Sequence, residues 1–368
     1  MKKLAVFLAL ILLAASAAAG VFILRARSPY RGYAGAEQFV DIPTGSGTSA
    51  IGARLVASGV VRDTLTFRAA LWMSGRARRL QAGEYRFDQA LTPAQVIDKI
   101  ARGDVYVVTL TFPEGLTIAD MAAIIESHGF GPAAAFVQAA KDVSLIRAID
   151  PAASDLEGYL FPETYSLPRH TDAPAIVRLM IARFLRVFGP DLRQAAESRG
   201  LSVRQAVTLA SIVEKETARP DERPLIAAVY TTRLRVGMPL QCDPTVIYAL
   251  QRAGRYDGNI HKVDLSIDSP YNTYRHPGLP PGPIAAPGKG ALEAAVHPAD
   301  ADFLYFVSRN DGTHAFARTL EEHNRNVQKY QVQYFRDLRA GGAGESGRTG
   351  RAGRPGAAGR AGREGRDE

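Results

Sequence analysis

Two glutamates, Glu214 and Glu216, lie at the end of an apolar segment that the sequence predicts to be a helix, residues 203–217. Ser202 precedes this segment, and serine is a preferred capping residue at helix N-termini. The apolar positions wrap most of the predicted helix, so we expect it to be buried on several sides. A carboxyl group held against apolar walls is disfavoured in its ionised form, which suits a general acid near neutral pH.

These two glutamates cannot act as a cooperating pair, because residues two apart on a helix point to roughly opposite sides. Each lies at a similar angle from the apolar centre of the helix, so periodicity alone does not choose between them. A solvated Glu-Lys-Glu helix end is the alternative interpretation of residues 214–216.

Other catalytic patterns are missing from the sequence. None of the seven histidines has the His-x-x-x-His spacing of a zinc-binding helix. Ser211 lacks the Gly-x-Ser-x-Gly turn of a hydrolase nucleophile, and no glycine-rich phosphate-binding loop is present. Cys242, the single cysteine, has no neighbouring cation to activate its thiol and cannot form an internal disulfide. We therefore expect neither a metal nor a cofactor.

A loop-rich stretch over residues 242–290, dense in proline and glycine, combines aromatic rings with hydrogen-bonding groups. Tyrosine offers a flat apolar face and a hydroxyl tip, a combination that suits sugar rings, and carboxylate and amide groups can bind sugar hydroxyls. A long stiff loop of this kind is more often functional than not. The aromatic residues are Tyr248, Tyr256, Tyr271 and Tyr274, and the polar residues near them are Gln241, Asp243, Asn272 and Thr273.

The elements that must position these residues begin with a repeated strand-turn-helix pattern. Each copy has an alternating strand, a Pro-x-Gly turn, and a helix with apolar residues four apart that ends at a glycine. Residues 85–103 resemble a third, degenerate copy. Such units cannot bury their own apolar faces, so we expect one compact αβ module over residues 36–130. The matching positions are Pro43, Gly45, Ile51, Leu55 and Gly59 in the first copy and Pro113, Gly115, Met121, Ile125 and Gly129 in the second.

Beyond this module the pattern predicts helices over 133–140, 175–188, 203–217 and 320–338, with a hairpin over 303–316. The last residues, from Gly341, place glycine at every third position but contain only one proline, Pro355. A collagen sequence needs about 15–20% proline and hydroxyproline. We therefore expect a disordered Gly/Arg-rich tail over residues 339–368.

An uncharged run from Leu4 to Leu24 is long enough for a helix that crosses a bilayer, so residues 1–32 are predicted to be a membrane anchor. A cleaved signal peptide is the alternative, because Ala17–Gly20 offers small residues at a cut site. Most of the net charge of +8 lies in the basic residues that flank this run and in the arginine-rich tail. The segment between is nearly neutral, which argues against nucleic-acid binding.

Several motifs in order closely resemble the YceG-like family of endolytic murein transglycosylases. The resemblance covers roughly residues 36–335. The motifs are residues 156–165 (LEGYLFPETY), 210–217 (ASIVEKET), 233–248 (RLRVGMPLQCDPTVIY), 271–274 (YNTY), 278–284 (GLPPGPI), His314-x-Phe316 and Glu322-His-Asn324. Cys242, which stands where small hydroxyl residues are common, and the Gly-x-y tail depart from the family pattern.

This resemblance implies an α+β protein: a single transmembrane helix, a LysM-like αβ module over 33–130, and a mixed α+β catalytic domain over 131–338. It implies a single-pass protein of the bacterial inner membrane whose catalytic domain faces the periplasm. The implied partners are peptidoglycan glycan strands, with peptidoglycan synthases as further candidates. The implied reaction is cleavage within nascent strands, between N-acetylmuramic acid and N-acetylglucosamine, leaving a 1,6-anhydro end and terminating elongation.

The family's catalytic glutamate falls in the motif over residues 214–217. We assign it to Glu216, because Glu216-Thr217 is similar to the Glu-Ser signature of other lytic transglycosylases, and keep Glu214 as the alternative. Such an enzyme needs only one carboxyl, since the sugar's own C6 hydroxyl replaces water. Gln241, Asp243, Asn272 and Tyr274 are the expected substrate-binding residues. A non-catalytic envelope scaffold that binds peptidoglycan and recruits synthesis enzymes is the alternative function.

Overall fold

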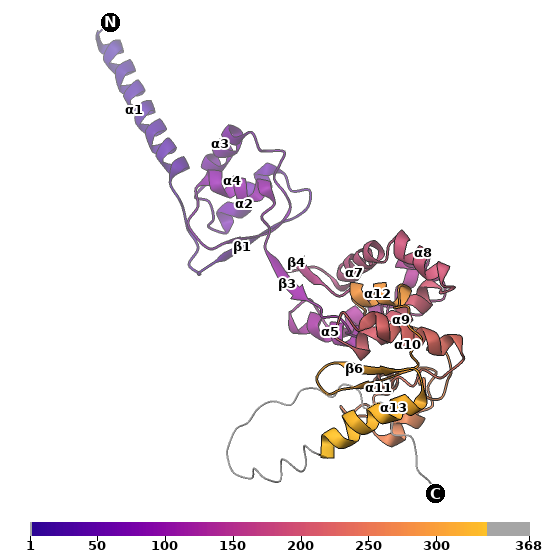
Figure 1. Cartoon of the computed structure of the whole chain (residues 1–368). Helices are drawn as coiled ribbons and strands as arrows, with labels where there is room; N and C mark the ends of the chain where they lie inside the picture. The colour runs from indigo at the N-terminus through magenta and orange to yellow at the C-terminus, as the bar shows by residue number, and fades with distance from the viewer. Residues whose placement is uncertain (1, 337–368) are drawn as a thin grey trace, which may run out of the picture. The chain divides into compact units, whose positions relative to one another are not determined.

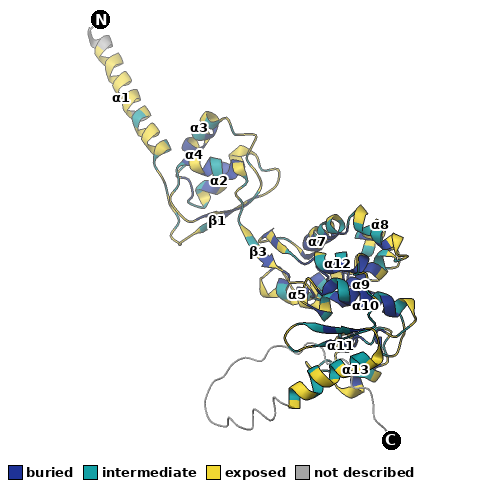
Figure 2. Ribbon diagram, in the orientation of Figure 1, coloured by how far each residue is buried: buried dark blue, intermediate teal, exposed yellow. Residues whose placement is uncertain are grey.

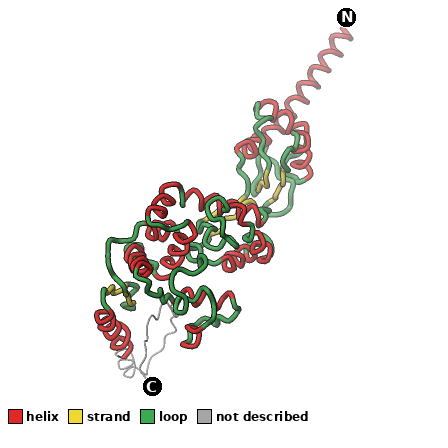
Figure 3. Tube along the Cα trace, turned by 90° about the vertical axis from the view of Figure 1, so that its right-hand side faces the viewer, coloured by secondary structure: helices red, strands yellow, loops and turns green. Residues whose placement is uncertain are grey.

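The structure, a computed structural model, describes residues 2–336 (Figure 1). The expected tail over 339–368 lies outside these residues. The chain divides into two compact units: one contains residues up to 110 together with 165–171, and the other contains residues 111–164 and everything from 172. Helices dominate and the strands are short (Figure 3), which confirms the α+β class.

The first unit begins with helix α1 (Lys2–Arg27). By length and composition, its segment Val6–Arg27 could cross a membrane, and it is the one candidate span among the described residues. Its described side chains are almost all exposed (Figure 2). This helix agrees with the predicted apolar anchor segment.

After α1 the first unit builds its own core from strands β1 (Gln38–Ile42) and β2 (Gly83–Phe87) and helices α2 (Thr48–Ala57), α3 (Thr64–Ser74) and α4 (Pro93–Arg102). β1 and β2 are antiparallel, with Val40 opposite Tyr85. Alternate residues of the strands and one face of each helix meet in a single apolar cluster. Its fully buried members include Leu55, Phe67 and Ile97.

The predicted repeat is present as local structure. The second copy is strand β3 (Val107–Thr111) and helix α5 (Ile118–Ser127), and the third is β2 with α4. The matched turn glycines Gly45 and Gly115 both have φ near +80°, a conformation that favours glycine. The copies do not form one module, however, because the division between the units comes at residue 110, before the expected boundary at 130. Helix α5 belongs to the second unit, where it packs against α6 (Ala133–Ala139).

The second unit is mostly helical. Strand β4 (Thr164–Pro168) pairs with β3, and most of both strands belongs to the first unit. In the second unit the predicted hairpin over 303–316 forms as an antiparallel pair, β5 (Tyr305–Ser308) and β6 (His314–Ala317). Its remaining elements are η1 (Val143–Leu145), α7 (Ala173–Val187), α8 (Pro190–Ser198), α9 (Val203–Glu216), α10 (Arg223–Arg235), α11 (Asp243–Arg252), η2 (Lys262–Ser266), α12 (Lys289–Val296), α13 (Leu320–Val327) and the π-helical turn η3 (Gln328–Gln333).

Helix α9 is the centre of the second unit. Ser202 caps it in a capping box with Gln205, and every residue from Ala206 to Val213 is buried. Helices α12, α10, α8 and α11 pack around it. The prediction of a capped helix buried on several sides is confirmed, and this burial fixes the position of its C-terminal end.

The proline- and glycine-rich loop that precedes α12 is seated on α9. The backbone N–H of Ile284 donates to Ser211 Oγ over 3.0 Å, and both residues are buried. The N–H of Ala286 donates to the carbonyl of Leu116, at the start of α5. The loop is thus held by buried hydrogen bonds rather than free to move in solvent.

Candidate active site

The carboxylate of Glu216, the last residue of α9, receives hydrogen bonds from two buried neutral donors. The hydroxyl of Tyr230 on α10 donates to Glu216 Oε1 over 2.5 Å. The thiol of Cys242, just before α11, donates to the same oxygen over 3.1 Å. Burial raises the pKa of Tyr230 and of Cys242 well above their ordinary values, so both groups keep their protons and remain donors.

The second oxygen of Glu216, Oε2, accepts no hydrogen bond within residues 2–336. The residue is partly exposed, and no Lys or Arg of this part of the chain forms an ion pair with it. One oxygen is therefore fixed by the protein, and the other is available to a ligand.

Asp243 and Tyr274 form a second polar pair beside Glu216. Tyr274 Oη donates to Asp243 Oδ1 over 2.6 Å. Burial raises the pKa of Asp243 to about 6, the Tyr274 hydrogen bond opposes that rise, and the charge of Glu216 adds to it. Asp243 opens α11 directly after Cys242, so the same helix start places both the thiol donor and this carboxyl near Glu216.

Gln241 joins this group through its backbone. It has φ of +47°, in the left-handed region, and its N–H donates to the carbonyl of Thr273 over 3.2 Å. Thr273 also accepts from the N–H of Cys242 at 3.0 Å. These two hydrogen bonds attach the start of α11 to the loop that carries Tyr274, and Gln241 adopts a strained backbone conformation at this attachment.

Asn272 does not lie where a sugar could contact it. Its side chain is completely buried, and its amide nitrogen donates to the carbonyls of Leu265 and Ile267, both at 2.9 Å. Its Oδ1 accepts the N–H of Tyr274 at 3.0 Å. The expected contact of Asn272 with substrate is corrected: all its hydrogen-bonding groups have protein partners, and it positions Tyr274.

Glu214, the alternative acid, is held differently. Its Oε1 accepts from Arg223 Nη2 at 2.9 Å, and its Oε2 accepts the N–H of Gly288, which precedes α12, also at 2.9 Å. The same Arg223 nitrogen bonds Glu114. Burial raises the pKa of Glu214 and Glu114 adds to the rise, while Gly288 and Arg223 oppose it. Both oxygens of Glu214 are thus occupied, and only 5% of its side chain is exposed.

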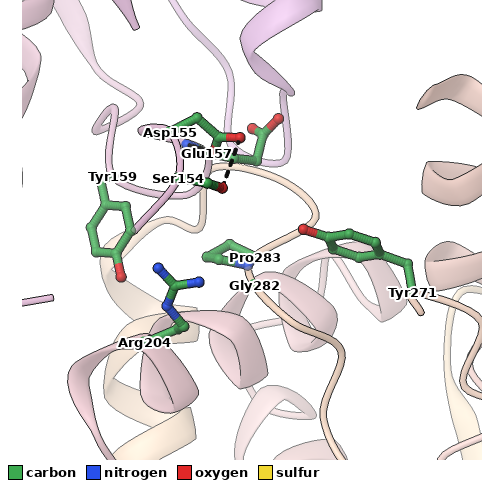
Figure 4. A pocket seen from close by; sticks show the side chains of 8 residues that line it. All are labelled: Ser154, Asp155, Glu157, Tyr159, Arg204, Tyr271, Gly282 and Pro283. Carbon is green, nitrogen blue, oxygen red and sulfur yellow. Dashed lines mark hydrogen bonds between the residues drawn. The ribbon is translucent and has the colours of Figure 1, made fainter. Parts of the chain in front are cut away.

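A small pocket elsewhere in the second unit contains a third buried carboxyl, Glu157 (Figure 4). It accepts from the N–H of Ile118, at the start of α5, and from the hydroxyl of Tyr248 at 3.2 Å. Burial and the neighbouring Asp155 raise the pKa of Glu157 to about 8. Arg204, near the opposite end of α9 from Glu216, also lines this pocket. Twelve residues of helix separate the backbones of Arg204 and Glu216 by about 18 Å, and Glu216 does not line this pocket.

Sequence reasoning missed the residues that distinguish the two glutamates. Tyr230 lies in a helical segment without any catalytic pattern, and Arg223 stands among other arginines. Nothing in the sequence around Cys242 indicates that its thiol is a hydrogen-bond donor to Glu216. His314 Nδ1 lies 2.6 Å from Glu222 Oε2, and the N–H of His314 donates to Glu222 Oε1, so this pair joins β6 to the start of α10. The family-like motifs around these residues were the only available signal.

The arrangement supports proton transfer by one carboxyl group. Glu216 has one fixed and one open oxygen, and Asp243 and Tyr274, whose groups can bind hydroxyls, lie beside it. Within residues 2–336, no cluster of three or more His, Cys, Asp or Glu side chains could hold a metal ion. The chemistry that these residues themselves can supply is general acid–base chemistry.

Comparison with known proteins places these residues in a larger context. A family model described as the YceG-like family matches residues 40–329. A protein of Bacillus subtilis strain 168 named endolytic murein transglycosylase is 34% identical over 307 residues, which cover 79% of this chain and 84% of that protein. A protein of the same name from Streptococcus pneumoniae strain D39 is 32% identical, and the match covers 79% of this chain but 58% of that longer protein.

A solved structure is also similar. The crystal structure of a putative YceG-like protein from Listeria monocytogenes aligns with a TM-score of 0.54 and 32% identity. The alignment covers 79% of this chain and 98% of that chain. The likeness therefore extends over most of both proteins.

Proposed function

The chain belongs to the YceG-like family and is a murein transglycosylase, and we propose that it cuts peptidoglycan glycan strands internally by a one-carboxyl lytic mechanism with Glu216 as the catalytic group. The bond cleaved is the one between N-acetylmuramic acid and N-acetylglucosamine, and the product carries a 1,6-anhydro end. One observation carries the assignment: Glu216 alone of the two candidate glutamates has an oxygen without a protein partner in residues 2–336.

The mechanism uses the two oxygens of Glu216 differently. Protonated Oε2 donates its proton to the glycosidic oxygen, and the bond from that oxygen to C1 of the muramic residue breaks. The same Oε2 then takes the proton of the C6 hydroxyl, whose oxygen bonds to C1 and closes the anhydro ring. No water is consumed, and Glu216 ends protonated as it began. Tyr230 and Cys242 hold Oε1 throughout, so the reacting oxygen keeps its direction.

Substrate positioning falls to the groups beside Glu216. Asp243 and the hydroxyl of Tyr274, which share a hydrogen bond, lie beside the reacting carboxylate and can bind sugar hydroxyls. Gln241, whose strained backbone directly precedes Cys242, is a further candidate for this role. The proline- and glycine-rich loop is attached to α9 at Ile284 and would form one wall of the substrate site.

The first unit would hold this enzyme at the membrane and on its glycan substrate. Helix α1 serves as a single-pass anchor in the inner membrane, with the catalytic unit facing the periplasm. The antiparallel β1–β2 pair with helices α2 and α3 between them serves as a LysM-like glycan-binding module. From this position the enzyme would cut nascent strands and end their elongation close to the peptidoglycan synthases that make them.

Product analysis tests the reaction and the residue together. The full-length protein is incubated with purified sacculi and with denuded glycan strands, and the products are identified by mass spectrometry. We expect 1,6-anhydro ends on fragments from within strands. Glu216→Gln should lower the rate by about 10²–10⁴-fold, the usual contribution of general acid–base catalysis. Full activity in Glu216→Gln, with loss in Glu214→Gln instead, would overturn the assignment; an inactive but correctly folded wild type would favour a scaffold.

A further inference from the structure

One face of helix α3 in the first unit exposes large apolar side chains to solvent. Leu65, Trp72 and Met73 are 69%, 84% and 73% exposed. Leu65 and Trp72 are seven residues apart and therefore lie on the same side of the helix. The opposite side is anchored in the core by Phe67 and Leu71, which are 0% and 5% exposed. The helix is thus anchored in the core, and the three side chains of its apolar outer face (the α3 face) are exposed to solvent, although α1 contacts α3.

The α3 face is surrounded by positive charge. Between Thr64 and Gly83 the sequence has four arginines, Arg68, Arg76, Arg78 and Arg79, and no acidic residue. Arg76 pairs with Asp98 on α4, whereas Arg68, Arg78 and Arg79 are exposed. No Asn, Gln, Asp or Glu occurs from Thr64 to Leu80. Amide and carboxylate side chains, which suit sugar hydroxyls, are therefore missing from the stretch of chain around Trp72, and this disfavours a glycan strand as the occupant.

The α3 face is also tied to the end of the candidate membrane span. The N–H of Tyr30 donates to the carbonyl of Leu91 over 3.0 Å, and the guanidinium of Arg62 lies 4.7 Å from the centre of the Tyr30 ring. Arg62 comes directly before Asp63, the residue that caps α3. Only two residues separate Arg27, the last residue of α1, from Tyr30, so their Cα atoms are at most about 11 Å apart. If α1 spans a bilayer, the start of α3 must lie close to its surface.

We propose that the α3 face binds the headgroup region of the membrane that α1 crosses, with anionic phospholipid as its partner. Trp72, Leu65 and Met73 enter the interface, where tryptophan is favoured, and Arg68, Arg78 and Arg79 attract the phosphate groups. The first unit is then held against the bilayer at two places, by α1 and by α3. This inference rests on the proposed anchoring by α1.

Trp72 is the only tryptophan of the chain, so its fluorescence reports on this face alone. The full-length protein is reconstituted into phosphatidylcholine vesicles with and without phosphatidylglycerol, using lipids brominated near the headgroup as quenchers. We expect a blue shift and quenching of Trp72, both stronger with phosphatidylglycerol. Unchanged emission in vesicles, at the value measured in detergent, would refute the proposal, as would protection of Trp72 from acrylamide by denuded glycan strands in place of vesicles.

Variants separate a specific contact from general proximity. Leu65→Ser with Met73→Ser should reduce the quenching of Trp72, and Arg78→Glu with Arg79→Glu should remove its dependence on phosphatidylglycerol. Val263→Ser, at a 70% exposed apolar residue of the second unit, is the matched control and should leave the quenching unchanged. Equal quenching in all variants would also count against the α3 face.

The anchor and the enzyme are tested separately in the same samples. Flotation of the vesicles after an alkaline wash measures insertion of α1, and release of anhydro ends measures catalysis. Protein that floats and cleaves, but whose Trp72 is not quenched, would refute this inference alone. Protein that does not float would refute the anchor and this inference together, leaving the catalytic proposal intact.

Discussion

Glu214 and Glu216 are two residues apart on one helix, yet their surroundings give them different properties. The side chain of Glu214 is 5% exposed, and it accepts a hydrogen bond from an arginine on one oxygen and from a backbone N–H on the other. Glu216 has two neutral donors on one oxygen, none on the other, and Asp243 nearby. An ion pair with both oxygens occupied stabilises a fold, whereas a carboxyl with one open oxygen can exchange protons with a ligand.

The largest effect should come from breaking the Glu214 side of the comparison. Arg223→Ala leaves Glu214 buried without its cation, so we expect the free energy of unfolding to fall by about 3–5 kcal/mol. Denaturant unfolding followed by circular dichroism measures this loss. Arg219→Ala is the matched control, because Arg219 forms an exposed pair with Asp221 and its loss should leave stability nearly unchanged. Equal losses in the two variants would mean that the Glu214 pair is not structural.

The surroundings of Glu216 should affect how the free energy of unfolding depends on pH, because no cation there balances the charge of Asp243. Its pKa is raised from 3.8 to about 6 in the folded protein. Between these values the unfolded state releases a proton that the folded state keeps, so stability falls as pH rises towards 6 and is level above it. Asp243→Asn should lack this decline, at most roughly 3 kcal/mol. Unfolding free energies of both proteins at pH 4 and pH 7 measure the difference, and parallel curves would argue against the raised pKa.

The fixed oxygen of Glu216 is tested by Tyr230→Phe. This change keeps the ring that packs edge-on against Phe306 and removes only the hydroxyl donor. A hydrogen bond to a charged group contributes about 1.5–3 kcal/mol, so we expect kcat to fall by about 10–100-fold with little change in KM. Initial rates of anhydro-end release from glycan strands measure both constants. An unchanged kcat would show that Oε1 needs no donor.

The smallest effect should come from Cys242, the weaker donor on the same oxygen. Cys242→Ala removes the thiol hydrogen bond and should reduce kcat by about 2–10-fold. Cys242→Ser supplies a stronger hydroxyl donor and should restore activity close to that of the wild type. The same rate measurement decides between them. A serine variant as weak as the alanine variant would indicate that the thiol acts by filling space.

The sequence predicted much of the local structure and part of the site. The capped helix over 203–217, the hairpin near residue 310 and the three strand-turn-helix copies are all present. Each depends on residues close together in the chain: a serine before an apolar repeat, an Asp-Gly turn, or a glycine at a helix end. The boundary at 130 differed, because α5 packs against α6 and that choice between neighbours is not encoded in α5 itself.

The site shows the same limit. Asp243 and Tyr274 lie beside Glu216 and remain proposed sugar-binding residues, but Asn272 is enclosed within its own loop. An asparagine in a turn can face a ligand or satisfy buried carbonyls, and its sequence neighbours are compatible with both. Asn272 satisfies buried carbonyls here because the folded loop places the carbonyls of Leu265 and Ile267 next to its amide nitrogen.

Short-range chemistry in the chain was therefore enough to establish an apolar N-terminal helix, a mixed α+β protein and a buried helix that ends in two glutamates. Which glutamate keeps an open oxygen was decided by tertiary packing, because the partners that distinguish them come from other elements: Tyr230 from α10, Cys242 from the start of α11, and Gly288 from the loop before α12. Helical periodicity determines which side of its own helix a side chain lies on. The hydrogen-bond donors that the side chain meets on that side depend on how the other helices pack.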